Sequence, residues 1–294
     1  MQAWSDGDIF VIGAGSMAEA LIRGVVEGGV VPPQQIVVQN RSRRDRILHL
    51  CETYGVRAAA GWSDVAHARW LVVATKPADA ASALQSARPF VTDQVILSFA
   101  AGITLAQLSD WAGGLCSVVR TMPNIPVSVG AGMTAVCFAD GVQPADRDSV
   151  GRLLEQLGSV AKIDESLMDA ATALSGSGPG LICFFLEGFE QAAVQLGFTP
   201  DLARTFLLQT LKGTAQTLDE WGLTPAELRE KVTSPGGTTF AGLEVLHQGG
   251  VAEVLTNALA AAARRSVELS EQAGIGWRPG PSSAKLSSGC GESR

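Results

Sequence analysis

The chain has 294 residues, 46% of them hydrophobic, and a mean hydropathy of +0.20, so it is long enough for about two domains with large cores. With 22 basic and 29 acidic residues, its formal net charge of −7 argues against nonspecific nucleic-acid binding. No apolar run reaches membrane-spanning length, and the start MQAWSDGD lacks the basic and apolar regions of a signal peptide, so we expect neither a membrane segment nor a leader.

Cysteine and histidine usage indicates a reducing compartment and no metal centre. The five cysteines are odd in number and scattered, which fits neither a disulfide framework nor a zinc motif and favours the cytoplasm. Only three histidines are present, and no HExxH motif occurs, so we expect no metal site. A soluble cytoplasmic enzyme is the class that remains.

A glycine-rich turn follows the first predicted strand. The apolar run Asp8 to Ile12 leads directly into Gly13-Ala14-Gly15-Ser16-Met17-Ala18, which opens a segment with apolar residues at helical spacing. In this G-x-G-x-x-A pattern, Gly13 makes the turn, Gly15 lets a pyrophosphate approach, and Ala18 lets helix and strand pack closely. The pattern between a strand and a helix predicts a dinucleotide site.

The end of the second predicted strand indicates which dinucleotide is bound. After Ile36 to Gln39, where an acidic residue would bind the ribose of NAD, the chain reads Asn40-Arg41-Ser42-Arg43-Arg44. No carboxylate is present to repel a 2′-phosphate, and several donors could bind one. We therefore favour NADP(H).

The remainder of the first half continues the alternation of strands and helices. Further strands are predicted at 70–74, 95–99, 117–120, 132–139 and 160–163, with a helix over 146–157. Thr75-Lys76-Pro77 and Ala100-Ala101-Gly102 follow strand ends, where open α/β sheets bind ligands. Pro123 and Pro126 rule out a helix over 122–126 and predict a rigid loop.

From Glu165 the pattern becomes helical. Residues 172–180 are read as a small-residue turn before a helix near Leu181 that is apolar nearly all round, as in a dimer core. Thr199-Pro200 and Thr224-Pro225 predict helix starts, and a last helix is expected over Val251 to Ala273. The predicted domains are residues 1–164, an α/β nucleotide-binding domain; 165–275, an all-helical dimerisation and substrate domain; and 276–294, a disordered tail rich in Gly, Pro and Ser.

The stretch Thr233 to Thr239 (TSPGGTT) is the expected centre of the chemistry. Two adjacent glycines let the backbone approach a ligand, and the apolar spacing of Phe240 to Gln248 predicts a helix directly after them. Unpaired N–H groups and the positive end of the helix dipole suit a carboxylate or a phosphate there. A plain helix cap after a turn is the alternative for this string alone.

The absence of the usual acid/base residue pairs limits which types of dehydrogenase the chain could be. Ala58, four residues after the only tyrosine, Tyr54, rules out a Tyr-x-x-x-Lys pair, and no His-Asp relay is evident. Lys212 could be the acid/base of a β-hydroxyacid dehydrogenase, although a solvated lysine is the simpler reading. A reductase without a strong acid is easiest to explain when its substrate is a C=N compound that carries its own proton.

With these motifs in order, the chain resembles the pyrroline-5-carboxylate reductase family, which catalyses the last step of proline synthesis. The resemblance runs from Ile9 to about Ala273, through FVIGAGSMAEALIRG, ATKP, FAAGI, RTMPNIPVSVGAGMT, ALSGSGPG and VTSPGGTTFAGLEVL. It implies an N-terminal Rossmann domain followed by a helical domain that interlocks in a dimer, with further assembly commonly to a decamer.

The resemblance also assigns roles by position. It places the pyrophosphate on Ile12, Gly13, Ala14, Gly15, Ser16 and Met17, the 2′-phosphate on Asn40 and Arg41, other parts of the cofactor on Ala74, Lys76 and Pro77, and the nicotinamide near Ala101 and Gly102. The substrate carboxylate is placed at Ser234, Gly236, Gly237, Thr238 and Thr239, with Ser177 at the mouth of the pocket. Thr239 is assigned as the catalytic hydrogen-bond partner of the ring nitrogen. Trp62 stands about where a cofactor-contacting Asn is common, which leaves that contact open.

The implied reaction is hydride transfer from NADPH, or from NADH, to the imine carbon of 1-pyrroline-5-carboxylate. A β-hydroxyacid dehydrogenase using Lys212 and a non-catalytic NADP-sensing protein remain alternatives. A six-membered cyclic imine is an alternative substrate.

Overall fold

The computed structural model describes residues 4–273. By their internal contacts these residues form two units, described separately below. The sheet unit comprises the described residues up to Ser177 together with those from Ala262 onward, and the helical unit comprises Gly178–Ala261.

One eight-stranded sheet forms the centre of the sheet unit, in the order β3-β2-β1-β4-β5-β6-β7-β8. The strands are β1 (Asp8–Ile12), β2 (Ile36–Gln39), β3 (Arg57–Ala58), β4 (Ala68–Val73), β5 (Val95–Ser98), β6 (Ser117–Pro123), β7 (Gly132–Phe138) and β8 (Gly158–Lys162). The first six are parallel, β7 runs antiparallel to β6, and β8 runs parallel to β7. The register aligns Phe10 with Val37 on one side and Leu71 on the other, all buried, as expected for a sheet covered on both faces.

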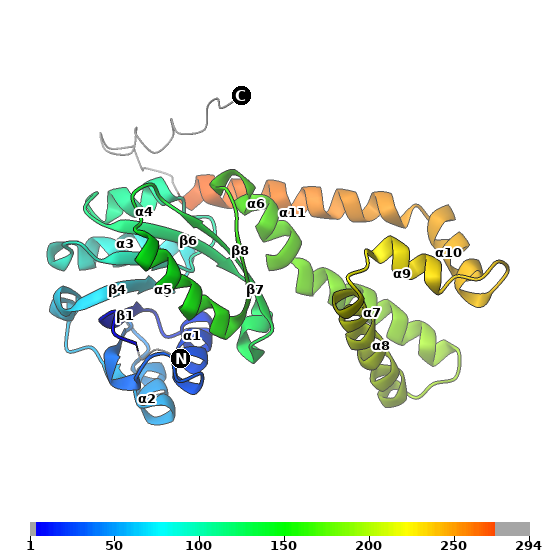
Figure 1. Cartoon of the computed structure of the whole chain (residues 1–294), viewed down its shortest axis with the longest axis horizontal. Helices are drawn as coiled ribbons and strands as arrows, with labels where there is room; N and C mark the ends of the chain where they lie inside the picture. Colours follow the sequence, from blue (N-terminus) through cyan, green and yellow to red (C-terminus); the bar gives the residue numbers. More distant parts are fainter. Residues whose placement is uncertain (1–3, 274–294) are drawn as a thin grey trace. The chain divides into compact units, whose positions relative to one another are not determined.

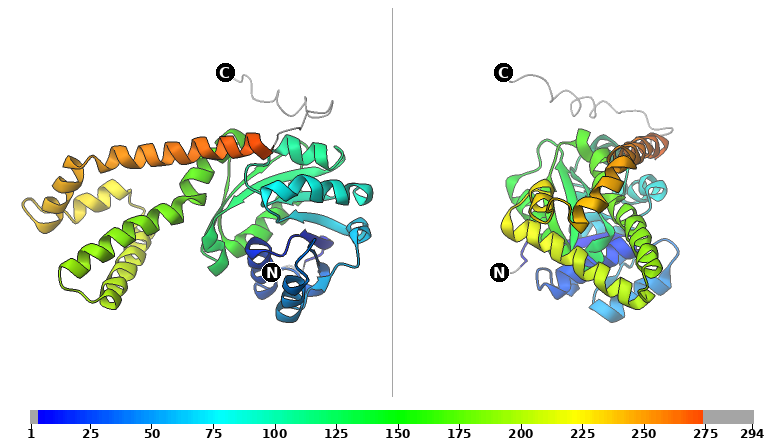
Figure 2. Two further views of the ribbon diagram at one scale, coloured as in Figure 1. Left: turned by 180° about the vertical axis from the view of Figure 1, so that it is seen from behind. Right: turned by 90° about the vertical axis from the view of Figure 1, so that its right-hand side faces the viewer.

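Helices cover both faces of this sheet (Figures 1 and 2). The α-helices are α1 (Ser16–Glu27), α2 (Arg44–Tyr54), α3 (Pro77–Ala87), α4 (Leu105–Trp111) and α5 (Pro144–Leu154), and the 3₁₀-helices are η1 (Pro33–Gln35), η2 (Trp62–His67), η3 (Arg88–Phe90), η4 (Ile125–Val129) and η5 (Glu155–Leu157). Helix α1 packs with α2 and α5, whereas α3 packs with α4. Because the strand order reverses between β1 and β4, the carboxyl ends of these two strands mark the crevice where such sheets bind dinucleotides.

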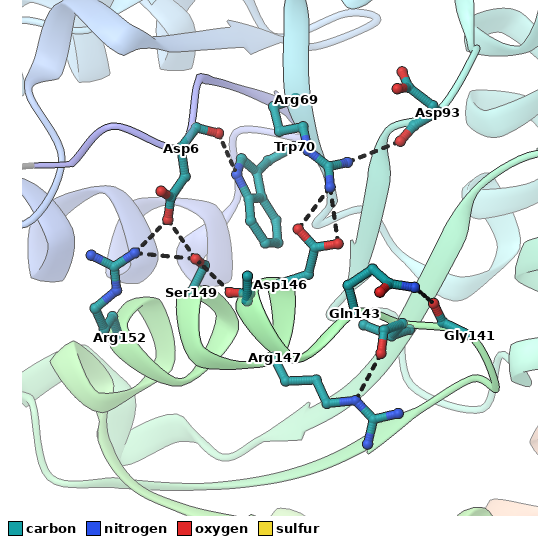
Figure 3. A network of polar contacts seen from close by, with 12 residues as sticks. Asp6, Arg69, Trp70, Asp93, Gly141, Gln143, Asp146, Arg147, Ser149 and Arg152 are labelled. Atoms are coloured by element: carbon teal, nitrogen blue, oxygen red, sulfur yellow. Dashed lines mark hydrogen bonds and ion pairs between the residues drawn. The ribbon is translucent and has the colours of Figure 1, made fainter.

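The segment ahead of β1 is tied to α5 and β4 by polar contacts (Figure 3). The Asp6 carboxylate accepts from Ser149 and Arg152, and its carbonyl accepts from the Trp70 indole N–H at 2.9 Å. Beside it, Nη2 of the Arg69 guanidinium donates to both carboxylate oxygens of the buried Asp146, at 2.7 and 2.9 Å. These contacts fix the start of β1, and therefore the position of the glycine turn at its end.

The loop predicted over 122–126 is partly wrong. Strand β6 continues to Pro123, and the 3₁₀-helix η4 then begins at Ile125 with Pro126 in its first turn. Prolines exclude the interior of an α-helix, but the first turn of a helix needs no N–H at that position, so Pro126 is compatible with a short 3₁₀ turn.

The turn predicted over 172–180 is also wrong, because the chain there is helical except for a bend at Ser177. Helices η6 (Glu165–Leu167) and α6 (Met168–Ala171) lead into the π-helix η7 (Thr172–Gly176), in which the Ser177 N–H donates to the Thr172 carbonyl at 2.8 Å. The small residues serve packing: a Cβ on Gly176 would lie 2.6 Å from Cε of Met122. The Asn124 amide holds the Ser175 carbonyl at 3.2 Å, which satisfies a carbonyl in the π turn.

Contacts from the sheet reach beyond the predicted boundary at 164/165, and that boundary stays a prediction. Glu165 accepts from Arg120 of β6 at 3.1 Å and from the Leu105 N–H at 2.7 Å. On the returning chain, Ser266 is buried and donates to Asp169 at 2.6 Å. These bonds explain why residues after Asp164 and after Ala261 cluster with the sheet.

The helical unit contains α7 (Gly178–Gln195), α8 (Pro200–Trp221), α9 (Pro225–Lys231), α10 (Thr238–Gln248) and the first part of α11 (Val251–Ala273), and no described residue of it is in a strand. The predicted starts at Thr199 and Thr224 are confirmed. Thr199 caps α8, and Thr224 forms a capping box with Glu227, whose backbone and side-chain hydrogen bonds from Thr224 lower the pKa of Glu227.

Many large apolar side chains of the helical unit are exposed. Phe184 and Phe189 on α7 are 71% and 57% exposed, and others lie on α8, α10 and α11. The apolar side chains that were predicted to surround α7 are therefore not buried within a single chain. No described helix combines the length and hydropathy needed to cross a membrane. The tail predicted as disordered, 276–294, lies outside the described residues.

Candidate active site

The glycine turn after β1 has the backbone that a pyrophosphate site requires. Gly13 has φ +118°, and a Cβ there would lie 2.3 Å from the carbonyl oxygen of Ala74, so only glycine fits. Gly15 precedes α1 as its N-cap, with open space where a Cβ would project. The Glu19 N–H makes the first intrahelical bond, to the Gly15 carbonyl, which leaves earlier N–H groups free for an anion.

A cavity of about 630 Å³ opens from this turn along the carboxyl ends of β1, β2 and β4. Its lining is Ile12, Gly13, Ala14, Gly15, Gln39, Asn40, Arg41, Ser42, Arg43, Trp62, Ala74, Thr75, Lys76, Asp79, Ser82, Ala83 and Ser86. Eight of the predicted cofactor residues thus border one space. Of the others, Ser16 and Met17 form the first turn of α1, Pro77 begins α3, and Ala101 and Gly102 follow β5.

The end of β2 is built without a carboxylate. The Asn40 side-chain oxygen accepts from the N–H groups of Ser42 at 3.1 Å and Arg43 at 2.9 Å, which fixes the turn. The Arg43 side chain forms an ion pair with Asp45, and its hydrogen bonds lower the pKa of the exposed Asp45 carboxyl to about 2. Arg41 remains on the cavity wall, so the geometry fits a phosphorylated ribose.

Arg46 supports the glycine turn from behind, and sequence reasoning missed it. Its Nε donates to the Ala14 carbonyl at 3.1 Å, while its other end pairs with Glu19. Burial alone would raise the pKa of Glu19, but the hydrogen bonds from Arg46 and His49 outweigh it and lower that pKa. The local sequence of α2 gives no signal for this role, because Arg46 contacts Ala14 and Glu19, which are distant in the sequence.

At the predicted nicotinamide edge, backbone packing is close. Gly102 has φ +73°, and a Cβ there would lie 3.2 Å from Oγ of Ser270 on α11. On the adjacent strands, the Thr121 hydroxyl donates to the Ser98 carbonyl at 2.8 Å, joining the carboxyl ends of β5 and β6. The requirement for glycine at position 102 thus follows from α11 as well as from any cofactor.

The predicted carboxylate site forms one turn of the helical unit. Gly236 has φ +70° and follows Pro235, and the Gly237 N–H donates to the Ser234 carbonyl at 3.0 Å, the pattern of a type II β-turn. The positive φ of Gly236 favours glycine, whereas a Cβ on Gly237 would lie 2.5 Å from the Ser234 hydroxyl oxygen, which would have to move.

This turn opens directly onto α10, as predicted. Gly237 is its N-cap, without a side-chain cap, and the first intrahelical bond comes from the Ala241 N–H. The N–H groups and hydroxyls of Thr238 and Thr239 therefore stand exposed at the positive end of the helix. Ser177 ends the π-helix in the sheet unit, and Lys212 is exposed on α8.

No cluster of histidine, cysteine or carboxylate side chains within residues 4–273 could hold a metal ion. A Rossmann sheet with a glycine turn at the switch point of the strand order, joined to a helical unit, defines an NAD(P)-dependent oxidoreductase. The chain belongs to the pyrroline-5-carboxylate reductase family, as the comparisons with known proteins show.

Two family models match parts of the chain. Residues 165–269 match the dimerisation domain of pyrroline-5-carboxylate reductase, and residues 8–102 match the model of coenzyme F420-dependent NADP oxidoreductases. Pyrroline-5-carboxylate reductase 2 of Bacillus subtilis is 36% identical over 262 residues, 89% of this chain and 94% of that protein.

Solved structures show the same architecture. The pyrroline-5-carboxylate reductase of Coxiella burnetii is 32% identical with a TM-score of 0.85, covering 90% of this chain and 99% of that one. The Plasmodium falciparum enzyme, solved with NADP bound, is 26% identical with a TM-score of 0.81, covering 90% and 98%. The predicted fold class and the predicted family are confirmed.

Proposed function

We propose that this protein reduces 1-pyrroline-5-carboxylate to L-proline with NADPH, as the last step of proline biosynthesis. The observation that carries the proposal is the Ser234–Gly237 turn, whose two glycines lead into the exposed start of α10. The same chain has a dinucleotide cavity and belongs to this family. When bound, the nicotinamide supplies a hydride. The residues of the chain bind the substrate and the cofactor and orient them.

The substrate carboxylate binds at the start of α10. The N–H groups of Thr238 and Thr239 and the nearby hydroxyls donate to it, in a position where the helix dipole favours negative charge. Each hydrogen bond to a charged partner contributes roughly 1.5–3 kcal/mol.

Thr239 orients the ring nitrogen and is not a strong acid. The substrate imine carries its own proton, so addition of hydride to its carbon sends the C=N electron pair to nitrogen and yields the secondary amine without a protein acid. The Thr239 hydroxyl hydrogen-bonds that nitrogen, and catalysis rests on positioning.

The residues at the end of β2 support NADPH over NADH. Asn40 fixes the turn, Arg41 lines the cavity, and the described turn offers no carboxylate to a ribose 2′-hydroxyl. Ala101 and Gly102 would border the nicotinamide.

We further propose that the exposed apolar helices pair two chains, and that dimers assemble further, up to a decamer. The family's dimerisation domain covers 165–269, and the exposed faces of α7 and α8 lie within it. The four described cysteines are free thiols, which agrees with a location in the reducing cytoplasm.

The direct test follows NADPH oxidation by the purified protein with and without 1-pyrroline-5-carboxylate, then repeats it with NADH and with the six-membered imine. We expect substrate-dependent oxidation that is faster with NADPH and with the five-membered ring. A folded protein that binds NADPH but oxidises it with neither imine would support a sensing role instead. Loss of turnover on Lys212→Ala would support the hydroxyacid dehydrogenase alternative.

A further inference from the structure

Trp62 forms part of the cavity wall beside the ribose-binding turn. It is the first residue of η2, it is half-buried, and it lines the same cavity as Asn40 and Arg41. Its ring lies against the fully buried Phe10, with ring centroids 6.2 Å apart and an interplanar angle of 35°. The core therefore holds this indole in place, and its remaining surface is available to a ligand.

Another part of the cavity wall is one side of α3, on which most residues are small. Asp79, Ser82, Ala83 and Ser86 line the cavity, and their spacing of three, four and seven residues places them on one helix face. Helix α3 packs against η2, so this face and Trp62 belong to one locality. Small side chains in the same cavity as an indole leave room for a flat ring.

The polar groups of this wall are acceptors. The Ser82 hydroxyl donates to the Asp79 carbonyl at 3.0 Å, and the Ser86 hydroxyl donates to the Ser82 carbonyl at 2.9 Å. Because each hydroxyl proton is already used, the oxygen lone pairs remain to accept a hydrogen bond. An amino group on a flat ring is the complement of such a wall.

We infer that Trp62 stacks on the adenine base of the dinucleotide, with the Ser82–Ser86 face of α3 closing the other side. The inference rests on the proposed NADPH site and adds the residue that recognises the base. Aromatic stacking is tolerant of ring chemistry, so this contact contributes affinity for NADPH and NADH alike, while Arg41 discriminates between them.

The test compares ligands that contain adenine with one that lacks it. We expect Trp62→Leu to weaken the Kd of 2′,5′-ADP and of NADPH about tenfold, whereas Trp62→Phe weakens both less than about threefold. Reduced nicotinamide mononucleotide has no adenine, so its Kd should be unchanged in both variants. Equal losses with and without adenine, or an unchanged Kd for 2′,5′-ADP in Trp62→Leu, would overturn the inference.

A second measurement follows the intrinsic tryptophan fluorescence of the wild-type protein and of two variants. Binding of 2′,5′-ADP should quench the intrinsic tryptophan emission, and Trp62→Phe should abolish this quenching. Trp221→Phe is the matched control, since that indole is 63% exposed on α8 and should leave the quenching intact. Persistence of the quenching in Trp62→Phe would also overturn the inference. Both measurements need only ligand binding, so they stand even where pyrroline-5-carboxylate turnover fails.

Discussion

The Arg41 guanidinium lies 3.2 Å from the Asp79 carboxylate, which joins the turn after β2 to the first turn of α3 at the cavity wall. Both side chains are more than a third exposed, so the pair contributes only about 0–1 kcal/mol to stability. A dianionic phosphate competes with Asp79 for the same guanidinium. The two residues therefore act in opposite directions on the preference for NADPH: Arg41 favours the 2′-phosphate, and Asp79 disfavours it.

Arg41→Gln should weaken NADPH binding about tenfold and leave NADH binding nearly unchanged, because a charge-assisted hydrogen bond to the 2′-phosphate is lost. Titration of each cofactor by its own fluorescence measures the two Kd values. Equal weakening of both would place Arg41 in the fold of the turn and not at the phosphate.

Asp79→Asn should strengthen NADPH binding roughly two- to fivefold at low salt, because it removes a negative charge near the phosphate and frees Arg41. NADH binding should not change. The gain should shrink as ionic strength rises, which a salt series can check. A weaker NADPH complex would mean instead that Asp79 holds Arg41 in its binding orientation.

Thr239→Ala should lower kcat/KM for 1-pyrroline-5-carboxylate at least about tenfold, because one hydrogen bond to a charged group is lost. The Kd of NADPH should stay the same. Thr239→Ser keeps the hydroxyl and should recover most of the activity. If the serine variant is as impaired as the alanine variant, the role of Thr239 is packing and not hydrogen bonding.

Gly13→Ala and Gly15→Ala should distinguish a loss of folding stability from a loss of NADPH binding. The added methyl group at Gly13 would meet the Ala74 carbonyl oxygen at 2.3 Å, so we expect a clearly lower melting temperature. At Gly15 it meets nothing within 4 Å, so the melting temperature should hold while NADPH binding weakens. Thermal unfolding with and without NADPH measures both. A Gly15 variant with full NADPH affinity would contradict the pyrophosphate assignment.

Glu165→Ala should destabilise the sheet unit by roughly 1–3 kcal/mol, because the Arg120 side chain, only 6% exposed, would lose its partner. Glu165→Gln should cost less, since its oxygen can still accept from the Leu105 N–H. Melting temperatures of the two variants check the order. An alanine variant as stable as the wild type would show that water replaces the carboxylate.

Local patterns were sufficient to predict most of the elements. Strand Ile36–Gln39, the helix Val251–Ala273 and the capping box at Thr224 agree with the sequence analysis, because periodicity and capping chemistry are local properties. The Gly- and Ser-rich stretch before α7 became a π-helix instead of a turn, because contacts with Met122 and Asn124, about fifty residues away, decide its conformation.

The candidate site was predictable only where a motif carries it. The glycine turn and Arg41 border the cavity as expected, but Asp79, Ser82 and Ser86 were missed. Their spacing indicates a helix face, yet the sequence does not state that this face meets the cofactor cavity. The roles assigned to Ser177 and to Ser234 through Thr239 stay predictions.

The apolar surface of α7 and α8 has a consequence for how the protein is made. In the proposed dimer, a newly synthesised chain would expose Phe184, Phe189 and their neighbours to water until a second copy covered them, so folding and assembly would form one concentration-dependent process. When denatured protein is diluted slowly, it stays longer at intermediate denaturant concentrations. There we expect aggregation to outcompete the recovery of active enzyme. The yield of active enzyme depends on how soon one chain meets another.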